Sequence, residues 1–412
     1  MDADTSASRS SGSPITTSDD PVGPLRLARE LVAAPTPNPP GDERAAAAVI
    51  VTALRQLGID DVKVVGQGPG RPNVIARVRG RGGGRSLIFN GHIDTRPPGD
   101  LDAWNSPPWE PVVRDGYLYG LGSADMKGAV AAMIHAAAEV ARAEVVGDLI
   151  LVFTADEEVD GNGARWLAEQ GFLAADAAII GEPGGITNDW EAIHLISRGV
   201  CVFRVTLSGT PMHSSLSDRL PSVNANVAMS RLIARFAAEA SVMLKFPAHP
   251  VVVASPTMNP ALVATGGVGY GVLPSTASFI SDIRVVPGMT REQVQNDIDT
   301  FLERAAMDDP DLEAEFSIEH WHPPCEIDAT HPVVTATVAA ARDVLGKTLP
   351  FGVFPGGTDA PFFRLIAGIP TVPSFGPGLL TAAHRPNECI STKSIEDATA
   401  IYAGTAVRFL DA

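Results

Sequence analysis

The stretch Asp148-Leu-Ile-Leu-Val-Phe-Thr-Ala-Asp-Glu-Glu158 decides the fold, because an unbroken apolar run ends in three consecutive acids. A short continuous apolar run is typical of a strand that is buried on both faces of a largely parallel sheet. The same pattern predicts strands at 73–78, 86–90 and 177–180, with helices at 126–143 and 163–169. Alternation of this kind indicates an α/β layer structure whose reactive residues lie at the carboxyl ends of the strands.

The character of the sequence changes near Arg198 and changes back near Pro323. Between them we expect strands and helices in the order βαββαβ, at 201–208, 223–240, 251–265, 277–286, 291–306 and 312–320. That order fits a small sandwich with both helices on one face.

The expected architecture is therefore α/β with a second domain inserted in the first. Residues 23–197 and 323–412 should form one domain with a mixed, mostly parallel sheet and helices on both faces. Residues 198–322 should form an α+β, ferredoxin-like domain. Residues 1–22, rich in Ser, Thr and Asp, are expected to be a disordered leader.

The bulk composition limits the kinds of partner. The chain has 412 residues and a net charge of −17, which argues against nucleic acid and anionic membranes, because both bind surplus Lys and Arg. An anionic small molecule needs only one local Arg and stays open. Three widely spaced cysteines, Cys201, Cys325 and Cys389, indicate reduced thiols and a cytoplasmic protein. The sequence has no run of 18 apolar residues, so a transmembrane segment is not supported.

Five candidate metal ligands follow one another along the chain. They are His92 in Gly-His-Ile-Asp, Asp125 in Gly-Ser-Ala-Asp-Met-Lys-Gly, Glu158, Glu182 in Gly-Glu-Pro, and His384 in Ala-His-Arg-Pro-Asn-Glu. Two imidazoles and three carboxylates suit a pair of divalent cations such as zinc. Singly, each has an ordinary structural explanation, such as a turn, a helix N-cap or a solvated loop charge. Together they favour metal-assisted hydrolysis of an amide.

Two further acids accompany these ligands. Glu157 and Glu158 are neighbours, and neighbours on an extended backbone point in opposite directions, so one can bind metal while the other stays uncoordinated. Asp94 lies two residues after His92, where its carboxylate can accept the second ring N–H of a metal-bound imidazole.

This ordered set resembles the dinuclear zinc deacylase and exopeptidase family, which includes acetylornithine deacetylase, succinyl-diaminopimelate desuccinylase, aminoacylase-like enzymes and glutamate carboxypeptidases. The resemblance extends from about Pro24 to the last residue. It implies that His92 and Glu182 complete one metal site, that Glu158 and His384 complete the other, and that Asp125 bridges them. Glu157 would be the general base that activates a water between the ions, and Asp94 the partner of His92. The implied cofactor is two divalent ions, zinc first, with cobalt or manganese as alternatives.

The resemblance also implies a cis Asp125–Met126 peptide. It implies that 23–197 and 323–412 form the catalytic, metal-binding domain and that 198–322 form a lid and dimerisation domain. His213, in Gly-Thr-Pro-Met-His-Ser-Ser, matches a lid histidine that acts in the active site of the partner subunit of a homodimer, the alternative being an ordinary turn residue. Arg284 matches a clamp for a substrate carboxylate, and Gly356-Gly357-Thr358-Asp359 matches a substrate-binding loop. Two features depart from the family: Gly271 replaces a common Asn, and the loop after His213 is longer by about two residues.

The expected function is hydrolysis of the amide bond of a small N-acyl amino acid. A zinc di- or carboxypeptidase and a non-catalytic binding protein are the alternatives. The family tends to carry Glu in the Gly-Glu-Pro motif of its deacylases, so Glu182 favours deacylation. The other histidines are assigned no role: His194, His249 and His331 are expected on the surface or in linkers, and His320 and His322 lack further ligands.

Overall fold

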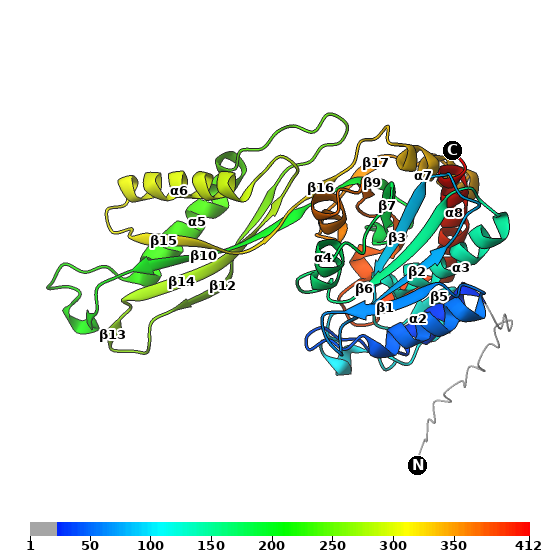
Figure 1. Ribbon diagram of the computed structural model, residues 1–412. Helices are drawn as coiled ribbons and strands as arrows, with labels where there is room; N and C mark the ends of the chain where they lie inside the picture. The colour runs from blue at the N-terminus through cyan, green and yellow to red at the C-terminus, as the bar shows by residue number, and fades with distance from the viewer. Residues whose placement is uncertain (1–22) are drawn as a thin grey trace, which may run out of the picture.

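The structure is a computed structural model that describes residues 23–412, so the expected leader, 1–22, lies outside the described residues. Figure 1 shows two bodies, a larger one that contains the carboxyl terminus and a smaller, elongated one. The smaller body is joined to the larger through the ends of its strands β10 (Gly199–Ser208) and β15 (Ala314–His322). We call the larger body, which contains the residues of the expected catalytic domain, the catalytic body and the smaller one the insert.

The centre of the catalytic body is a six-stranded sheet. Its strands are, in spatial order, β1 (Val62–Gly66), β2 (Pro72–Val78), β6 (Asp148–Thr154), β3 (Ser86–His92), β7 (Ala177–Ile180) and β18 (Thr371–Val372). The last four are mutually parallel, whereas β2 pairs antiparallel with both β1 and β6, so the sheet is mixed and mostly parallel, as expected. His92 lies opposite Thr154 in the β3–β6 register, which brings the residues after both strands to the same edge of the sheet.

Helices cover both faces of this sheet. Successive side chains of β6 point to opposite sides, so this strand contributes to two separate apolar cores. Leu149, Leu151 and Phe153 belong to the core that includes α1, α3 and α8, whereas Ile150 and Val152 belong to a second core with α4. Each fully buried aliphatic side chain of this kind contributes about 1.5–3 kcal/mol. The helices are α1 (Pro24–Val32), α2 (Arg44–Gln56), α3 (Gly128–Ala143), α4 (Asn162–Glu169), α7 (Pro332–Leu345) and α8 (Thr392–Leu410).

The insert is a four-stranded antiparallel sheet with two helices on one face (Figure 1). Its spatial order is β12 (Thr257–Gly266), β14 (Thr276–Val285), β10 and β15, and its helices are α5 (Ala225–Met243) and α6 (Arg291–Asp308). Alternate residues of β10 are buried, and Phe203 contacts Phe236 of α5, which in turn contacts Phe301 of α6. The other face of β10, with Val200 and Val202, remains available to the catalytic body.

Short strands complete the structure, and the apolar pattern did not predict them because most are only two to five residues long. They are β4 (Val112–Arg114), β5 (Tyr117–Tyr119), β8 (Pro183–Gly185), β9 (Ile193–Ser197), β11 (Met212–His213), β13 (Val272–Leu273), β16 (Cys325–Glu326), β17 (Phe351–Phe354), β19 (Gly376–Leu379) and β20 (Cys389–Ser391). β9 pairs with β16 and β17, and β5 pairs with β20, so segments distant in sequence are tied together.

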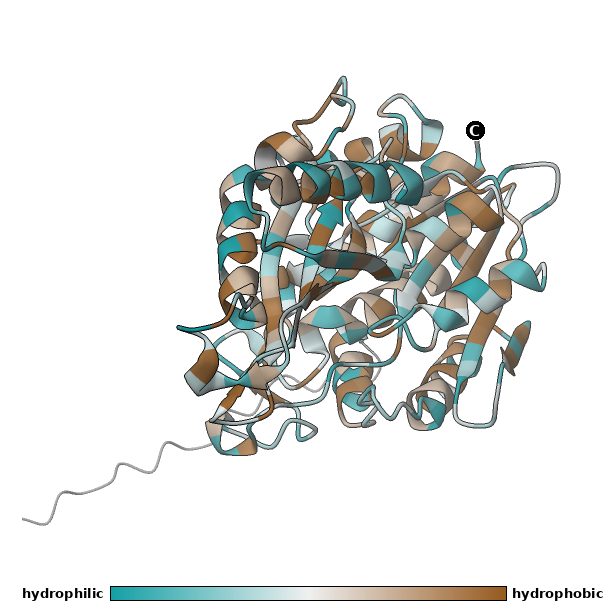
Figure 2. Cartoon of the chain, turned by 90° about the vertical axis from the view of Figure 1, so that its left-hand side faces the viewer, coloured by the Kyte–Doolittle hydropathy of each residue, from teal (hydrophilic) through white to brown (hydrophobic). Residues whose placement is uncertain are grey.

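The helices carry both polar and apolar residues along their length (Figure 2). Across residues 23–412, none of them combines the length and the hydropathy that a membrane crossing requires.

Candidate metal centre

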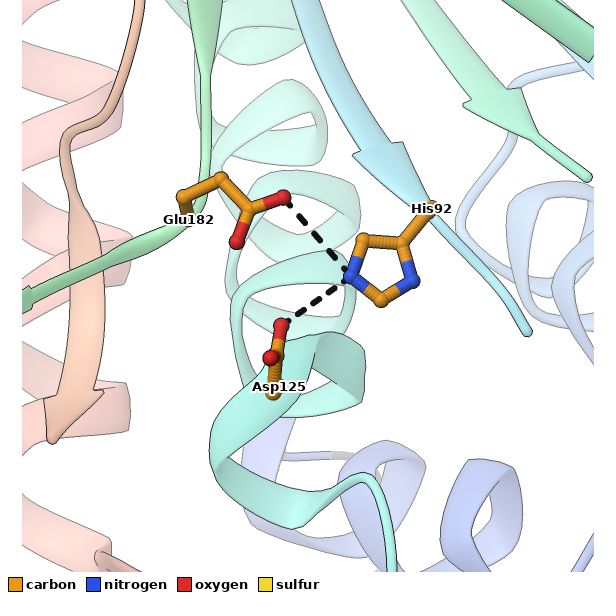
Figure 3. Close-up of side chains that lie close together, drawn as sticks. All are labelled: His92, Asp125 and Glu182. Atoms are coloured by element: carbon orange, nitrogen blue, oxygen red, sulfur yellow. Dashed lines mark hydrogen bonds and ion pairs between the residues drawn. The ribbon is translucent and has the colours of Figure 1, made fainter. Parts of the chain in front are cut away.

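Three buried side chains meet at the carboxyl edge of the central sheet. His92 ends β3, Glu182 follows β7, and Asp125 lies in the turn Ser123–Lys127 that leads into α3. Figure 3 shows one ring nitrogen of His92 facing both carboxylates. His92 Nε2 lies 3.0 Å from Asp125 Oδ1 and 3.7 Å from Glu182 Oε1. One donor atom from each residue lies within 4.8 Å of the other two, a spacing that could hold one metal ion.

A second group of three shares Asp125 with the first. His384 Nε2 lies 3.0 Å from Glu158 Oε2 and 3.2 Å from Asp125 Oδ2, and the three residues again offer atoms within 4.8 Å of one another. The two oxygens of Asp125 therefore face different histidines, Oδ1 toward His92 and Oδ2 toward His384. The structure thus gathers all five candidate ligands into two adjoining groups with one common carboxylate.

The electrostatics of the two groups favour a bound cation. Burial and the neighbouring carboxylates of Asp125 and Glu157 raise the pKa of Glu182 well above its ordinary value. Burial opposes protonation of His384, but its hydrogen bonds to Asp125 and Glu158 raise its pKa to about 10. Protons thus compensate crowded negative charge here, and divalent cations held by the same oxygen and nitrogen donors would compensate it in their place.

The turn that carries Asp125 is held by a residue that the sequence analysis did not single out. The Glu388 carboxylate accepts hydrogen bonds from the backbone N–H groups of Gly122, Ala124 and Asp125, at 2.9, 2.9 and 3.1 Å. Gly122 has φ +79°, a left-handed conformation that favours glycine. The Asp125–Met126 peptide is cis, as the family resemblance implied. Glu388 closes the quoted motif Ala-His-Arg-Pro-Asn-Glu, and that position was its only signal in the sequence.

The expectation that Glu157 and Glu158 lie on extended backbone is wrong. Residues 157–160 form a turn after β6, and Asp156 has φ +67°. The carboxylate of Asp94 holds this turn, because its Oδ1 accepts the N–H of Glu157 at 3.1 Å and its Oδ2 accepts that of Glu158 at 3.2 Å. The turn, not strand alternation, lets Glu158 join the second ligand group while Glu157 lines the adjoining cavity.

Asp94 is also close to the first ligand group. His92 Nδ1 lies 3.0 Å from the main-chain oxygen of Asp94 and 3.6 Å from its carboxylate.

Desolvation and the nearby carboxylates of Asp359 and Glu158 raise the pKa of Glu157 well above its ordinary value. A carboxyl that holds protons readily is suited to taking up a proton and passing it on.

A cavity of about 550 Å³ lies between the catalytic body and the insert. From the catalytic body it is lined by Arg96, Asp125, Glu157, Glu158, Glu182, Gly356, Gly357 and His384, among others. From the insert it is lined by Val200, Val202, Arg284, His320 and His322. Arg284 donates to Asp282 at 3.1 Å, and it shares this cavity with both ligand groups.

The remaining predicted site residues lie in different places. Thr358 is fully buried beside the cavity, and its carbonyl oxygen accepts a hydrogen bond from His322 Nε2 at 3.0 Å. His213 is exposed in β11, which pairs with β13 at the far end of the insert, and it is not among the residues that line the cavity (Figure 1). Gly271 lies beside it, with φ +82°, and its carbonyl oxygen accepts the N–H of Ser214. A single chain therefore does not bring His213 to the ligand groups.

The structure also places three of the other histidines. His320 and His322 face the cavity from β15, because Val202 pairs with His320 and Val200 with His322. The expectation that His194 is a surface or linker residue is wrong. It is 2% exposed, its Nδ1 lies 3.0 Å from Ser374 Oγ, and burial lowers its pKa to about 4.

The chain is similar to several known proteins. A family model described as "Peptidase family M20/M25/M40" matches residues 88–408. A succinyl-diaminopimelate desuccinylase of Methylobacterium radiotolerans is 30% identical over 404 residues, covering 95% of this chain and 97% of the relative. Another, of Gluconacetobacter diazotrophicus, is 37% identical over 204 residues, which span 47% of this chain and about half (51%) of that protein. The M20 family metallo-carboxypeptidase Sso-CP2 of Sulfolobus solfataricus has a similar fold, with a TM-score of 0.72, 18% identity and coverage of 94% and 99%.

Proposed function

The chain belongs to peptidase family M20/M25/M40 and is a hydrolase, and from this premise we propose that it cleaves the amide bond of an N-acyl amino acid. One observation carries the proposal: the two ligand groups that share Asp125 open onto the cavity that also contains Glu157 and Arg284. The nearly full-length similarity to a desuccinylase supports an acyl group as the part removed.

Two divalent metal ions are the proposed cofactor, zinc first, with cobalt or manganese as alternatives. His92 and Glu182 would hold one ion, Glu158 and His384 the other, and Asp125 both. The nitrogen and carboxylate donors fit these metals. The carboxylates crowded around Glu182, which raise its pKa, carry the negative charge that the cations would offset. Ions bound there would polarise the amide carbonyl and make water a better nucleophile at neutral pH.

The chain's own residues would perform the proton transfer and orient the substrate. Glu157 would take a proton from the attacking water and deliver it to the leaving amine nitrogen. Asp94 would keep the Glu157 backbone and the His92 ring in place, since it contacts both. Arg284 would bind the carboxylate of the amino acid, for which its planar guanidinium is suited, beside the backbone of Gly356 and Gly357.

A second copy of the chain would supply His213, giving a homodimer that assembles through the insert. β12 is an edge strand, and large apolar side chains are exposed on it and on the neighbouring β12–β14 connection, namely Leu262, Val263, Val268, Tyr270 and Val272. Exposed apolar residues along an unpaired strand edge favour association. In the partner's cavity, His213 would donate to the amide oxygen as negative charge develops there. The free cysteines Cys201, Cys325 and Cys389 support a cytoplasmic location.

A substrate panel tests the proposal. Purified protein is stripped with a chelator, reloaded with zinc, cobalt or manganese, and offered N-acetyl, N-succinyl and N-formyl amino acids alongside dipeptides. We expect release of primary amine from the N-acyl amino acids, only after metal is added. Faster cleavage of dipeptides would assign the chain to the peptidases, and bound metal without any hydrolysis would favour a binding protein.

A further inference from the structure

Asn38 lies on the segment between α1 and α2, next to the carboxylates of Asp94 and Asp156. This segment runs beside the residues after β3, because Asn38 N–H donates to the Thr95 oxygen at 2.8 Å and Thr95 N–H donates to the Thr36 oxygen at 2.9 Å. Asn38 is 1% exposed, so its side chain exchanges no hydrogen bond with bulk water. All of its polar atoms must therefore be paired inside the protein.

The side-chain amide of Asn38 links two buried carboxylates. Its Nδ2 donates to Asp94 Oδ2 at 2.8 Å and to Asp156 Oδ1 at 2.8 Å. Asp94 accepts the backbone N–H groups of Glu157 and Glu158, and Asp156 immediately precedes them in the chain. One amide group thus supports the turn that bears the proposed base and a proposed ligand on two sides.

Arg71 fixes which way this amide points. Its guanidinium donates to Asn38 Oδ1 at 3.0 Å and to Glu43 Oε1 at 2.7 Å, and it lies 3.3 Å from Asp156 Oδ1. A flipped amide would turn its N–H groups toward the guanidinium and its oxygen toward the carboxylates. Gly41 leaves room for the guanidinium of Arg71, because a Cβ on residue 41 would overlap it. Gly41 also has φ +76°.

We propose that Asn38 and Arg71 are positioning residues of the metal centre, acting through Asp94 and Asp156 on the turn that carries Glu157 and Glu158. The inference rests on the proposed function, because it assigns these residues to the metal centre of that hydrolase. Neither residue belongs to the ligand groups. Loss of an outer partner of a metal ligand typically weakens metal binding or activity about 10- to 100-fold.

Asn38→Asp is the sharpest substitution, because it keeps the shape and replaces the two N–H donors with an anionic oxygen. That oxygen would face the carboxylates of Asp94 and Asp156, which repel it. Arg71→Met removes the guanidinium at a position where the side chain is 28% exposed. Arg77→Met is the matched control, because it also removes an arginine ion pair near the sheet, with Asp148 at 3.0 Å, but one that does not involve Asp94 or Asp156.

The experiment titrates zinc into the stripped full-length chain by calorimetry, and records melting temperature, kcat and KM for the same samples. We expect Asn38→Asp to raise the zinc Kd about 10-fold and to lower kcat with little change in KM. Arg71→Met should shift the Kd in the same direction by a smaller factor, and Arg77→Met should change only the melting temperature.

A zinc Kd within about twofold of wild type in folded Asn38→Asp and Arg71→Met would overturn the positioning role, whatever their melting temperatures. If Asn38→Asp does not fold, Arg71→Met alone decides by the same criterion. A wild-type chain that binds zinc but hydrolyses no amide would refute the proposed function while leaving the affinity comparison valid. A wild-type chain that binds no zinc would refute both.

Discussion

The catalytic body and the insert hold their functional residues in opposite ways. In the catalytic body, four of the five ligand candidates, His92, Asp125, Glu158 and Glu182, are at most 5% exposed, although His384 is exposed. Carboxylates such as Glu388 and Asp94 hold the turns around them. In the insert, His213 is exposed at the distal end, and Arg284 is held mainly by Asp282. The contrast fits the proposed division of labour, in which the reactive groups would be fixed within one chain and substrate recognition would be completed by the insert and by a second chain.

The largest effect should come from the catalytic body. Glu157→Ala should lower kcat about 10²- to 10⁴-fold, because it removes the proposed proton acceptor. Metal content should stay at the wild-type value, since Glu157 is in neither ligand group. Turnover and metal analysis on the same preparation check this, and near-normal turnover or lost metal would contradict the assignment.

His213→Ala tests whether the insert acts across a dimer. We expect kcat to fall about 10²- to 10³-fold, because the partner's site would lose the donor to its amide oxygen. Metal content should not change, because His213 is exposed in β11 and belongs to neither ligand group. Mixing and reassembling this variant with Glu157→Ala should restore about one quarter of wild-type activity, since half of the randomly paired dimers are mixed and each has one intact site. Absence of recovery, with subunit exchange verified by mass, would place His213 outside a shared site.

A smaller effect is expected at the boundary between the two regions. Arg284→Met should raise KM about 10- to 100-fold by removing the charged partner of the substrate carboxylate, with a lesser change in kcat. An otherwise identical substrate whose carboxylate is replaced by a carboxamide serves as the control, because it should be hydrolysed equally by the variant and the wild type. Equal KM values for the carboxylate substrate would show that Arg284 does not contact it.

The smallest effect concerns the ionisation of the catalytic body after metal removal. The pKa of His384 in the folded chain is about 10, above its ordinary 6.5, so its stabilising contribution is complete below pH 6.5 and is lost as the pH rises toward 10. The raised pKa of Glu182 acts in the same direction. We expect the stripped protein to melt lower at pH 9 than at pH 6.5, by about 1–2 °C for each kcal/mol lost in a chain of this size.

Thermal scans with and without zinc check this expectation. Zinc at pH 9 should restore the melting temperature, because the metal replaces the protons that the site has lost. A stripped protein that melts equally at both pH values, or higher at pH 9, would show that these groups are not crowded in solution.

The main elements could be predicted from the sequence because their signals are local. The expected strands 148–154 and 177–180 coincide with β6 and β7, and the order βαββαβ of the insert is confirmed. Continuous apolar runs and helical periodicity are properties of neighbouring residues, so no distant contact is needed to recognise them. The five ligand candidates were found from short local motifs, and three of them, His92, Glu158 and Glu182, directly follow expected strands.

What could not be predicted depends on contacts between distant segments. The placement of His322 at the cavity follows from the register of β15 on β10, which no local pattern specifies. The burial of His194 follows from its hydrogen bond to Ser374, 180 positions away. The turn at Glu157 was mistaken for extended backbone because the hydrogen bonds that shape it come from Asp94.

The discontinuity of the catalytic body has a consequence for biosynthesis. The strands and helices of the insert are complete once residue 322 has left the ribosome, whereas His384 and Glu388 are translated much later. Because nascent chains fold from their amino-terminal side, the insert can fold before the residues that complete the candidate metal centre have been synthesised. A polypeptide released before residue 388 would lack the carboxylate that holds the turn of Asp125, so every such truncated product should be inactive however well its insert folds.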